Sequence, residues 1–381
     1  MRFFLLLIFF ITSSAALAYP HFIGHSYTSC LNCHYNPAGN GPLTDYGRAI
    51  SATLISSGAF YPESMTEEQI AHTSGFLFRK PKQNYVRTQI NYRGLQLVRN
   101  PGSSSSEIKQ WINMQSDASL ILKSPSDRFL AVVNYGYTIK PAGSATETDQ
   151  WKSREHYLGF RFTPKIGLYA GLMDKVYGIR VVEHTSVNRT TPEVTQKDQA
   201  HGVKAHYLGE KYEAFVHGFV GDLAKKSEAR KKGGSFMFER TVGDIHRIGA
   251  SVMHAKDEVQ KLLSYAIHGR WNLKEGSAVL AELGQSSRSS EDVNSLNKTS
   301  RYGLLQTYLR PVRGVYLFTN IEYYQDDTQM EPYLVRWGPG LQYFPINRIE
   351  LRGEILNTRV FSPDTASKDL WSYLVQVHVW L

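Results

Sequence analysis

The stretch Arg348-Ile349-Glu350-Leu351-Arg352-Gly353-Glu354-Ile355 alternates strictly between charged residues and apolar or small ones. Successive side chains of a β-strand point to opposite faces, so the charged residues share one face and the others share the opposite face. A soluble sandwich also alternates, but it would have to bury these charged side chains in its core, which is costly. The stretch therefore indicates a strand with one face toward lipid and the other toward water.

The same period of two runs from about residue 85 to the C-terminus. It is clear at residues 86–93, at residues 333–343 and at residues 370–381, where the chain ends in Trp380 and Leu381. Aromatic residues make up 12% of the 381-residue chain. Alternating strands, aromatic girdles and a mildly hydrophilic whole are typical of membrane barrels. We therefore predict an all-β fold, a transmembrane antiparallel β-barrel.

Along this region, tight turns alternate with longer polar connections. The predicted turns are Ser124-Pro125-Ser126-Asp127, Thr163-Pro164-Lys165, Gly209-Glu210-Lys211, Gly243-Asp244, Lys274-Glu275-Gly276, Pro311-Val312-Arg313-Gly314 and Phe344-Pro345-Ile346-Asn347. Short periplasmic turns and long outer loops characterise bacterial outer-membrane barrels. The count is about sixteen strands. Fourteen and eighteen are the alternatives, because residues 166–206 leave room for an extra strand pair or for a loop folded into the pore.

Three parts of the chain can be separated by composition. Residues 1–18 have the apolar stretch and the Ala16-Leu17-Ala18 cleavage site of a signal peptide. Residues 19–80 form a small, partly helical segment, and residues 81–381 form the barrel. The formal charge of +9 does not indicate nucleic-acid binding, because an exported protein does not normally meet a genome. The expected surrounding of the barrel is the lipid bilayer.

The segment before the barrel contains Cys30-Leu31-Asn32-Cys33-His34, the pattern of a c-type haem attachment site. The two cysteines would form thioether bonds to one haem, and His34 would be the proximal ligand of its iron. A small disulfide or a chance match is the alternative. Because these are the only two cysteines of an exported chain, haem c is the favoured cofactor.

The residues that follow the motif suit a haem pocket. Gly39 and Gly41 would let backbone pass close to a flat ring, and Thr44 or Asp45 would cap a helix over about residues 43–57. About sixty residues bury little surface on their own, so the segment is expected to use the haem and the barrel wall as its missing core. We expect it on the periplasmic side of the barrel or inside it.

This order of parts resembles the fused monohaem cytochrome and porin proteins of the bacterial outer membrane, known as iron oxidases. The resemblance includes the Cys-x-x-Cys-His motif, Pro37 and the run Leu43-Thr44-Asp45-Tyr46-Gly47-Arg48. It implies an electron conduit, with Fe(II):cytochrome oxidoreductase as the activity that the resemblance suggests. The implied partners are a periplasmic c-type cytochrome and an extracellular redox-active metal or mineral.

The sequence leaves the remaining haem contacts open. His25 or Met65 is the favoured distal ligand among four candidates near the motif, the others being His21 and His72. Arg48 is a candidate partner of a haem propionate.

Two groups of charged residues lie outside the motif. Alternating charges on the water-facing side of the strands are best explained as porin lining, and they include Arg87, Arg93, Glu350, Arg352 and Glu354. The long connection after residue 173 carries four residues of metal-ligating type whose spacing fits no template, namely Asp174, Glu183, His184 and Glu193.

The sequence leaves three functions to compare. The favoured one is electron transfer through a single haem between an extracellular donor such as Fe(II) and periplasmic cytochromes, and metal reduction is the same path in reverse. The second is a diffusion porin or structural barrel whose haem segment is a plug or redox sensor. The third is a haem enzyme such as a peroxidase, which needs an open sixth position on the iron.

Overall fold

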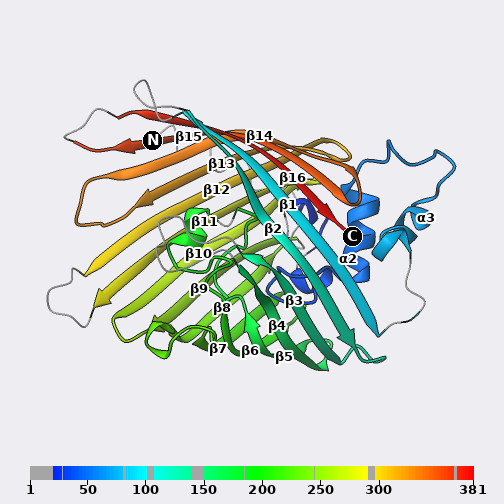
Figure 1. Ribbon diagram of the computed structural model, residues 1–381, viewed down its shortest axis with the longest axis horizontal. Coiled ribbons are helices and arrows are strands. Elements are labelled where there is room, and N and C mark those ends of the chain that lie inside the picture. The colour runs from blue at the N-terminus through cyan, green and yellow to red at the C-terminus, as the bar shows by residue number, and fades with distance from the viewer. Residues whose placement is uncertain are drawn as a thin grey trace.

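The computed structural model describes residues 20–27, 29–79, 83, 85–100, 107–138, 150–183, 185–243, 245–290, 297–363 and 367–381. The predicted signal peptide and His184 lie outside these residues. In the described part, sixteen antiparallel strands form one closed barrel, in which every strand pairs with its neighbours in the chain and β1 pairs with β16 (Figure 1). The predicted all-β barrel and its strand count are confirmed.

The strands are β1 (Val86–Asn100), β2 (Ile108–Lys123), β3 (Phe129–Thr138), β4 (Gln150–Thr163), β5 (Ile166–Met173), β6 (Ala200–Leu208), β7 (Tyr212–Gly221), β8 (Lys232–Val242), β9 (His246–Lys256), β10 (Gln260–Lys274), β11 (Ser277–Ser290), β12 (Lys298–Val312), β13 (Val315–Gln325), β14 (Tyr333–Ile346), β15 (Ile349–Phe361) and β16 (Asp369–Trp380).

The helical elements are short. They are α1 (Pro20–Ile23), η2 (Cys30–Asn32), α2 (Asp45–Ile50), η3 (Ser51–Ile55), α3 (Glu67–His72), η4 (Phe76–Phe78), α4 (Val187–Thr190) and η5 (Ser227–Ala229). None of the helices within the described ranges is long and apolar enough to cross a membrane.

The two ends of the barrel differ. At one end, which we call the turn end, lie the tight turns, the start of β1 and the last residue, Leu381, which pairs with Ile90 of β1. The opposite end, the loop end, carries the longer connections. In Figure 1 the turn end is at the right, beside the C-terminus and the helices α2 and α3.

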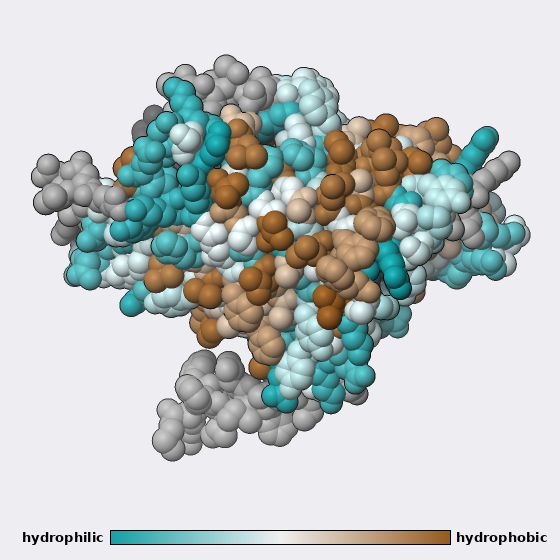
Figure 2. All heavy atoms as spheres, turned by 90° about the horizontal axis from the view of Figure 1, so that it is seen from below, coloured by the Kyte–Doolittle hydropathy of each residue, from teal (hydrophilic) through white to brown (hydrophobic). Residues whose placement is uncertain are grey.

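The outer surface of the barrel is apolar. Along β15 the expected alternation holds, since Leu351 and Ile355 are exposed on the outside while Glu350, Arg352 and Glu354 are buried on the inside. Figure 2 shows one side of the barrel, where hydrophobic residues form a band across the middle with hydrophilic residues on both sides. A closed wall with such a band leaves no unpaired strand edge in contact with lipid, which is what a membrane-spanning sheet requires.

Because the hydrophobic band faces lipid, a charged side chain placed in it should destabilise the barrel. Ile267, in the middle of β10, is 64% exposed on the outer face. We expect Ile267→Arg to destabilise the barrel by about 2–4 kcal/mol, because the guanidinium would have to sit in hydrocarbon. Urea unfolding in phospholipid vesicles measures this.

Val259 provides the control for that experiment, because it is 66% exposed in the short connection between β9 and β10 at the loop end. Val259→Arg should leave the unfolding midpoint unchanged. Equal effects of the two substitutions would mean that Ile267 does not face lipid.

The interior of the barrel is polar and filled by two segments. One is the N-terminal segment, which we define as residues 20–57. The other is the connection between β5 and β6, residues 174–199, which we call the inserted loop. Ile23 of the first segment and Ile179 and Val181 of the second belong to one buried cluster with residues of the wall. Among the described residues the connection therefore folds into the lumen and adds no strand pair.

Candidate functional site

The N-terminal segment is fastened to the wall near the turn end. The amide of Gly276, in the turn between β10 and β11, donates to the carbonyl of Gly24 at 2.5 Å. Arg87 of β1 forms a two-pronged ion pair with Asp45, with N···O distances of 2.7–2.9 Å. Burial alone would raise the pKa of the Asp45 carboxyl, but Arg87 holds it below its ordinary value. The carboxylate is therefore ionised and paired at neutral pH.

Local hydrogen bonds shape the Cys-x-x-Cys-His motif. Ser29 caps the one-turn helix η2, and its hydroxyl also donates to the Glu213 carboxylate of β7 at 2.6 Å. His34 pairs with Leu43 in an isolated β-bridge, which closes the Pro- and Gly-rich loop between them. Thr44, one of the two capping residues that the sequence offered beside Asp45, then caps α2 with its hydroxyl. The motif is thus held at both ends, by the wall and by its own helix.

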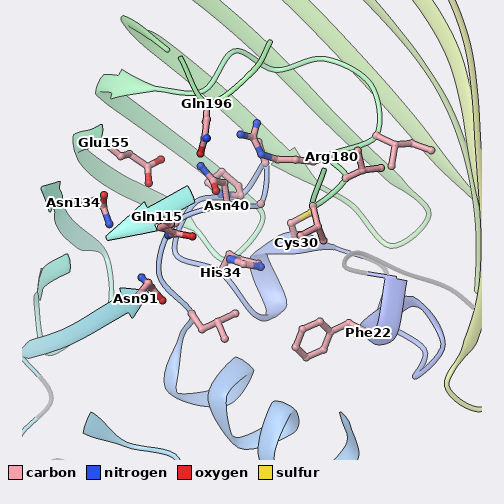
Figure 3. A pocket seen from close by; sticks show the side chains of 18 of the residues that line it. Phe22, Cys30, His34, Asn40, Asn91, Gln115, Asn134, Glu155, Arg180 and Gln196 are labelled. Atoms are coloured by element: carbon pink, nitrogen blue, oxygen red, sulfur yellow. The ribbon is translucent and has the colours of Figure 1, made fainter. Parts of the chain in front are cut away.

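The motif lies on a cavity of about 270 Å³ inside the barrel. Figure 3 shows Cys30, His34 and Asn40 of the N-terminal segment around this space, with Arg180 and Gln196 of the inserted loop on another side. The wall contributes polar side chains, which Figure 3 shows at Asn91, Gln115, Asn134 and Glu155. The volume is close to the lower end of ordinary ligand pockets, which is roughly 300 Å³.

The motif side chains are uncharged in this setting. Shielding from water raises the pKa of the Cys30 thiol to about 11 and that of the Cys33 thiol to about 12. It also lowers the pKa of His34 to about 4, against the opposing effect of the backbone of Gly41 and Asn40. Neutral imidazole is the form that binds a metal, so His34 needs no deprotonation at neutral pH.

These residues fit a covalently bound haem c. Both cysteines are free thiols, and Nδ1 of His34 is buried with no hydrogen-bond partner in the structure. Gly39 adopts the left-handed region at φ 78°, and a Cβ there would lie 3.3 Å from the Cys30 sulfur. Arginines on the cavity suit the carboxylates that haem carries, and they are Arg93, Arg154, Arg180, Arg189 and Arg270.

Gly47 sets how closely α2 approaches the motif. A Cβ on Gly47 would collide with the carbonyl oxygen of Cys33. We expect Gly47→Ala to cost about 1–3 kcal/mol of local stability by overpacking. Hydrogen exchange of peptides covering residues 30–48 should become faster.

Gly58 is a matched control, since a Cβ there meets nothing within 4 Å. Gly58→Ala should leave the exchange of the same peptides unchanged. Unaltered exchange in Gly47→Ala as well would show that α2 does not pack against the motif in the way described.

Beside Cys30 the wall carries a buried network of ions. Arg247 of β9 is 1% exposed and bonds Glu213 at 2.6 Å and Glu239 at 3.0 Å. Each carboxylate has further partners, His206 for Glu213, and His268 and Arg270 for Glu239. Because Glu213 also accepts from Ser29, this network joins five strands of the wall, β6 to β10, to the Cys-x-x-Cys-His motif.

Three predicted contacts lie away from the cavity lining. Arg48 is buried and donates to the carbonyl of Thr88 in β1 at 2.8 Å. His25 follows α1, and burial together with Arg310 lowers its pKa to about 4. Met65 is half-buried just before α3. None of the three is among the residues that line the cavity, so their roles toward haem remain predictions.

The charged residues of the inserted loop that the structure describes have partners inside the barrel. Arg352 of the wall pairs with Glu183 of the inserted loop, and Glu193 pairs with Lys231 at 2.6 Å. Asp174 accepts from Asn40 at 2.7 Å and also pairs with Arg180. Within the described residues no group of three or more His, Cys, Asp or Glu side chains is arranged to hold a metal ion. The acidic residues of the inserted loop therefore hold the loop in place inside the barrel.

Sequence reasoning did not identify which wall and loop residues reach the cavity. Gln89, Asn91 and Arg93 of β1 all do, as does His378 of β16. Alternation assigned the β1 residues to the water-facing side, and the same rule places His378 there. The signal for a lumen position was present, but nothing in the sequence says which lumen positions lie at the depth of the motif.

Known proteins resemble this chain in fold. No family model matches it, and no curated protein matches it in sequence. Among solved structures, a loop L8 deletion mutant of the outer membrane protein OmpT of Vibrio cholerae superposes with a TM-score of 0.62 at 12% identity, covering 78% of this chain and 99% of that one. The outer membrane channel DcaP of Acinetobacter baumannii gives 0.58 at 14%, covering 81% and 99%.

A third similar structure is an anion-selective porin from Comamonas acidovorans, with a TM-score of 0.58 at 9% identity over 78% of this chain and 99% of that one. At such low identity these likenesses establish the fold alone. The chain has the sixteen-stranded architecture of outer-membrane porins, with its lumen occupied by the N-terminal segment and the inserted loop.

Proposed function

We propose that this porin-fold barrel is an outer-membrane electron conduit that carries one covalent haem c in its lumen. Cys30 and Cys33 would hold the haem through thioether bonds, and His34 would bind its iron. The observation that carries the proposal is the position of the motif, which lines an internal cavity together with residues of the inserted loop. When bound, haem supplies a one-electron Fe(III)/Fe(II) couple inside the barrel.

The N-terminal segment and the inserted loop reach the proposed haem from opposite ends of the barrel. The N-terminal segment is fastened at the turn end, which we assign to the periplasm because short turns lie there in bacterial barrels. The inserted loop connects β5 and β6 at the loop end, which we assign to the cell exterior. Its residues Gly178 to Val182 line the same cavity as Cys30. A redox centre at this place shortens the distance for electron transfer to the extracellular donor and to the periplasmic cytochrome.

The proposed reaction is a transfer of single electrons. An extracellular donor such as Fe(II) loses one electron and becomes Fe(III), and a periplasmic c-type cytochrome gains that electron. The iron substrate rests on the resemblance to cytochrome and porin fusions, which the sequence carries at residues 30–48. The barrel wall separates the electron path from lipid and holds the N-terminal segment and the inserted loop between the donor and the acceptor.

A visible absorption spectrum tests this proposal. The protein is produced with haem c maturation, extracted in detergent, and examined before and after anaerobic addition of Fe(II). We expect a c-type spectrum that changes to the reduced form with Fe(II). Reduction by dithionite alone would keep the haem and reject iron as the donor, and a protein without covalent haem would reject the conduit.

The second candidate is a diffusion channel in which the N-terminal segment is a plug. Two observations favour it: the similar solved structures include a channel and an anion-selective porin, and the cavity is lined by several arginines. A channel should let small anions into vesicles whether or not haem is attached. His34→Ala should then leave solute uptake unchanged, whereas a conduit should lose electron transfer.

A further inference from the structure

One histidine of the barrel wall has the surroundings of a metal ligand. His378 lies on β16, its side chain is 15% exposed, and its Nε2 atom is buried with no hydrogen-bond partner in the structure. The other ring nitrogen, Nδ1, lies 3.1 Å from the Glu350 carboxylate of β15. A carboxylate on one imidazole nitrogen, with the other nitrogen free, is the arrangement that orients histidines toward metals.

The contacts of Nδ1 favour the tautomer that a metal requires. Glu350 accepts hydrogen bonds, whereas Arg93, 3.2 Å from the same nitrogen, donates them. If the proton is on Nδ1 it is bonded to Glu350, and Nε2 keeps a free lone pair. If it is on Nε2, a buried N–H has no acceptor, which is costly. The first arrangement is therefore favoured, with the Arg93 cation beside the carboxylate.

A short chain of contacts connects His378 to the haem motif. Its ring lies 4.9 Å from that of Trp380, centroid to centroid. Trp380 packs against the buried cluster that contains Cys33, with Leu43 at the edge of the same cluster. Leu43 pairs with His34 in the β-bridge. His378 and His34 also line the same cavity.

Met237 is the other side chain of the cavity lining that often ligates haem iron, and its surroundings are different. It is buried in a cluster with Val176 and Phe215, and Ala38 packs against that cluster. The orphan nitrogen of His378 is the stronger candidate, since a buried polar atom without a partner calls for one.

We infer that Nε2 of His378 is the distal ligand of the haem iron, opposite His34. This inference rests on the proposed function, because it requires the haem at Cys30 and Cys33. It differs from the sequence-based preference for His25 or Met65, neither of which lines the cavity. Ligation from β16 would tie the N-terminal segment to the wall through the iron. It would also leave the iron no open position for peroxidase chemistry.

The test uses the full chain with haem attached, in the ferric state, followed by electron paramagnetic resonance. The wild-type iron should be low-spin. His378→Ala should convert it to high-spin, and added imidazole should restore the low-spin signal. Met237→Leu, inside the cavity, is a matched control that should remain low-spin.

His217→Phe is a second control, because His217 is buried with both nitrogens unpartnered but does not line the cavity. It should also remain low-spin. If His378→Ala fails to fold, as judged by heat-modifiable migration in electrophoresis, His378→Met takes its place. A thioether ligand should keep the iron low-spin and raise its reduction potential.

The outcomes separate the two claims. A His378→Ala protein that stays low-spin would overturn this inference, and so would a wild-type iron that is high-spin; in both cases the covalent haem stands. A wild-type protein without covalent haem would overturn the proposed function, and the inference would fall with it.

Discussion

Replacing both cysteines, as Cys30→Ala/Cys33→Ala, should remove all covalent haem and leave a folded barrel. These are the only cysteines of the chain, so no other residue can form the thioether bonds. The barrel should persist because its sixteen strands pair with one another without any contribution from the motif. Haem-dependent peroxidase staining after denaturing electrophoresis measures the first effect, and heat-modifiable migration measures the second.

The same variant should lose electron transfer completely. Because Cys33 belongs to a buried cluster at the turn end, a modest loss of stability of the N-terminal segment is also expected. Ser29→Ala is the control in the same turn, since it removes the bond to Glu213 but neither thiol. That protein should stain for haem at the wild-type level. Haem staining of the double cysteine variant would contradict the assigned attachment site.

Arg247→Met should be among the most damaging single substitutions in the wall. Arg247 is almost fully buried between two carboxylates, and losing one partner of a buried ion pair typically costs about 3–5 kcal/mol. We expect about 3 kcal/mol, because Glu213 retains His206 and Glu239 retains Arg270. The free energy of unfolding in urea, measured in vesicles, gives the effect.

Two further variants make that experiment specific. Arg247→Met/Glu213→Gln should recover part of the loss, because it removes one of the charges left uncompensated. Lys109→Met breaks the exposed pair with Glu107 at the loop end and should leave the unfolding midpoint unchanged. If Arg247→Met were as mild as Lys109→Met, the buried network would not be a source of stability.

Much of the barrel could be predicted because its signal is local. Residues 348–355 show which side chains face lipid without reference to the rest of the chain, and the tight turns mark most of the strand ends. The helix after the Cys-x-x-Cys-His motif was also predictable, since Thr44 is a capping residue in front of a helical stretch. Its bounds, and the π-helical turn η3 that follows, depend on packing at the turn end.

The interior was harder to predict because its contacts join distant parts of the chain. The inserted loop was an open alternative, since its place depends on bonds such as the one from the Ile179 amide to Glu282, at 2.5 Å. Arg93 and His378 are 285 positions apart and meet only because β1 closes the barrel against β16. The sequence-based choice of His25 and Met65 used closeness along the chain, which does not report closeness across a lumen.

Electron transfer across a sealed membrane tests the central claim most directly. Vesicles that contain the haem-loaded protein and enclose an oxidised c-type cytochrome receive Fe(II) on the outside, and the absorbance of the enclosed cytochrome is followed. We predict that the cytochrome is reduced with the wild-type protein and stays oxidised with Cys30→Ala/Cys33→Ala. If the enclosed cytochrome stays oxidised with both proteins, or is reduced equally fast because Fe(II) simply passes through the pore, the barrel is not an electron conduit.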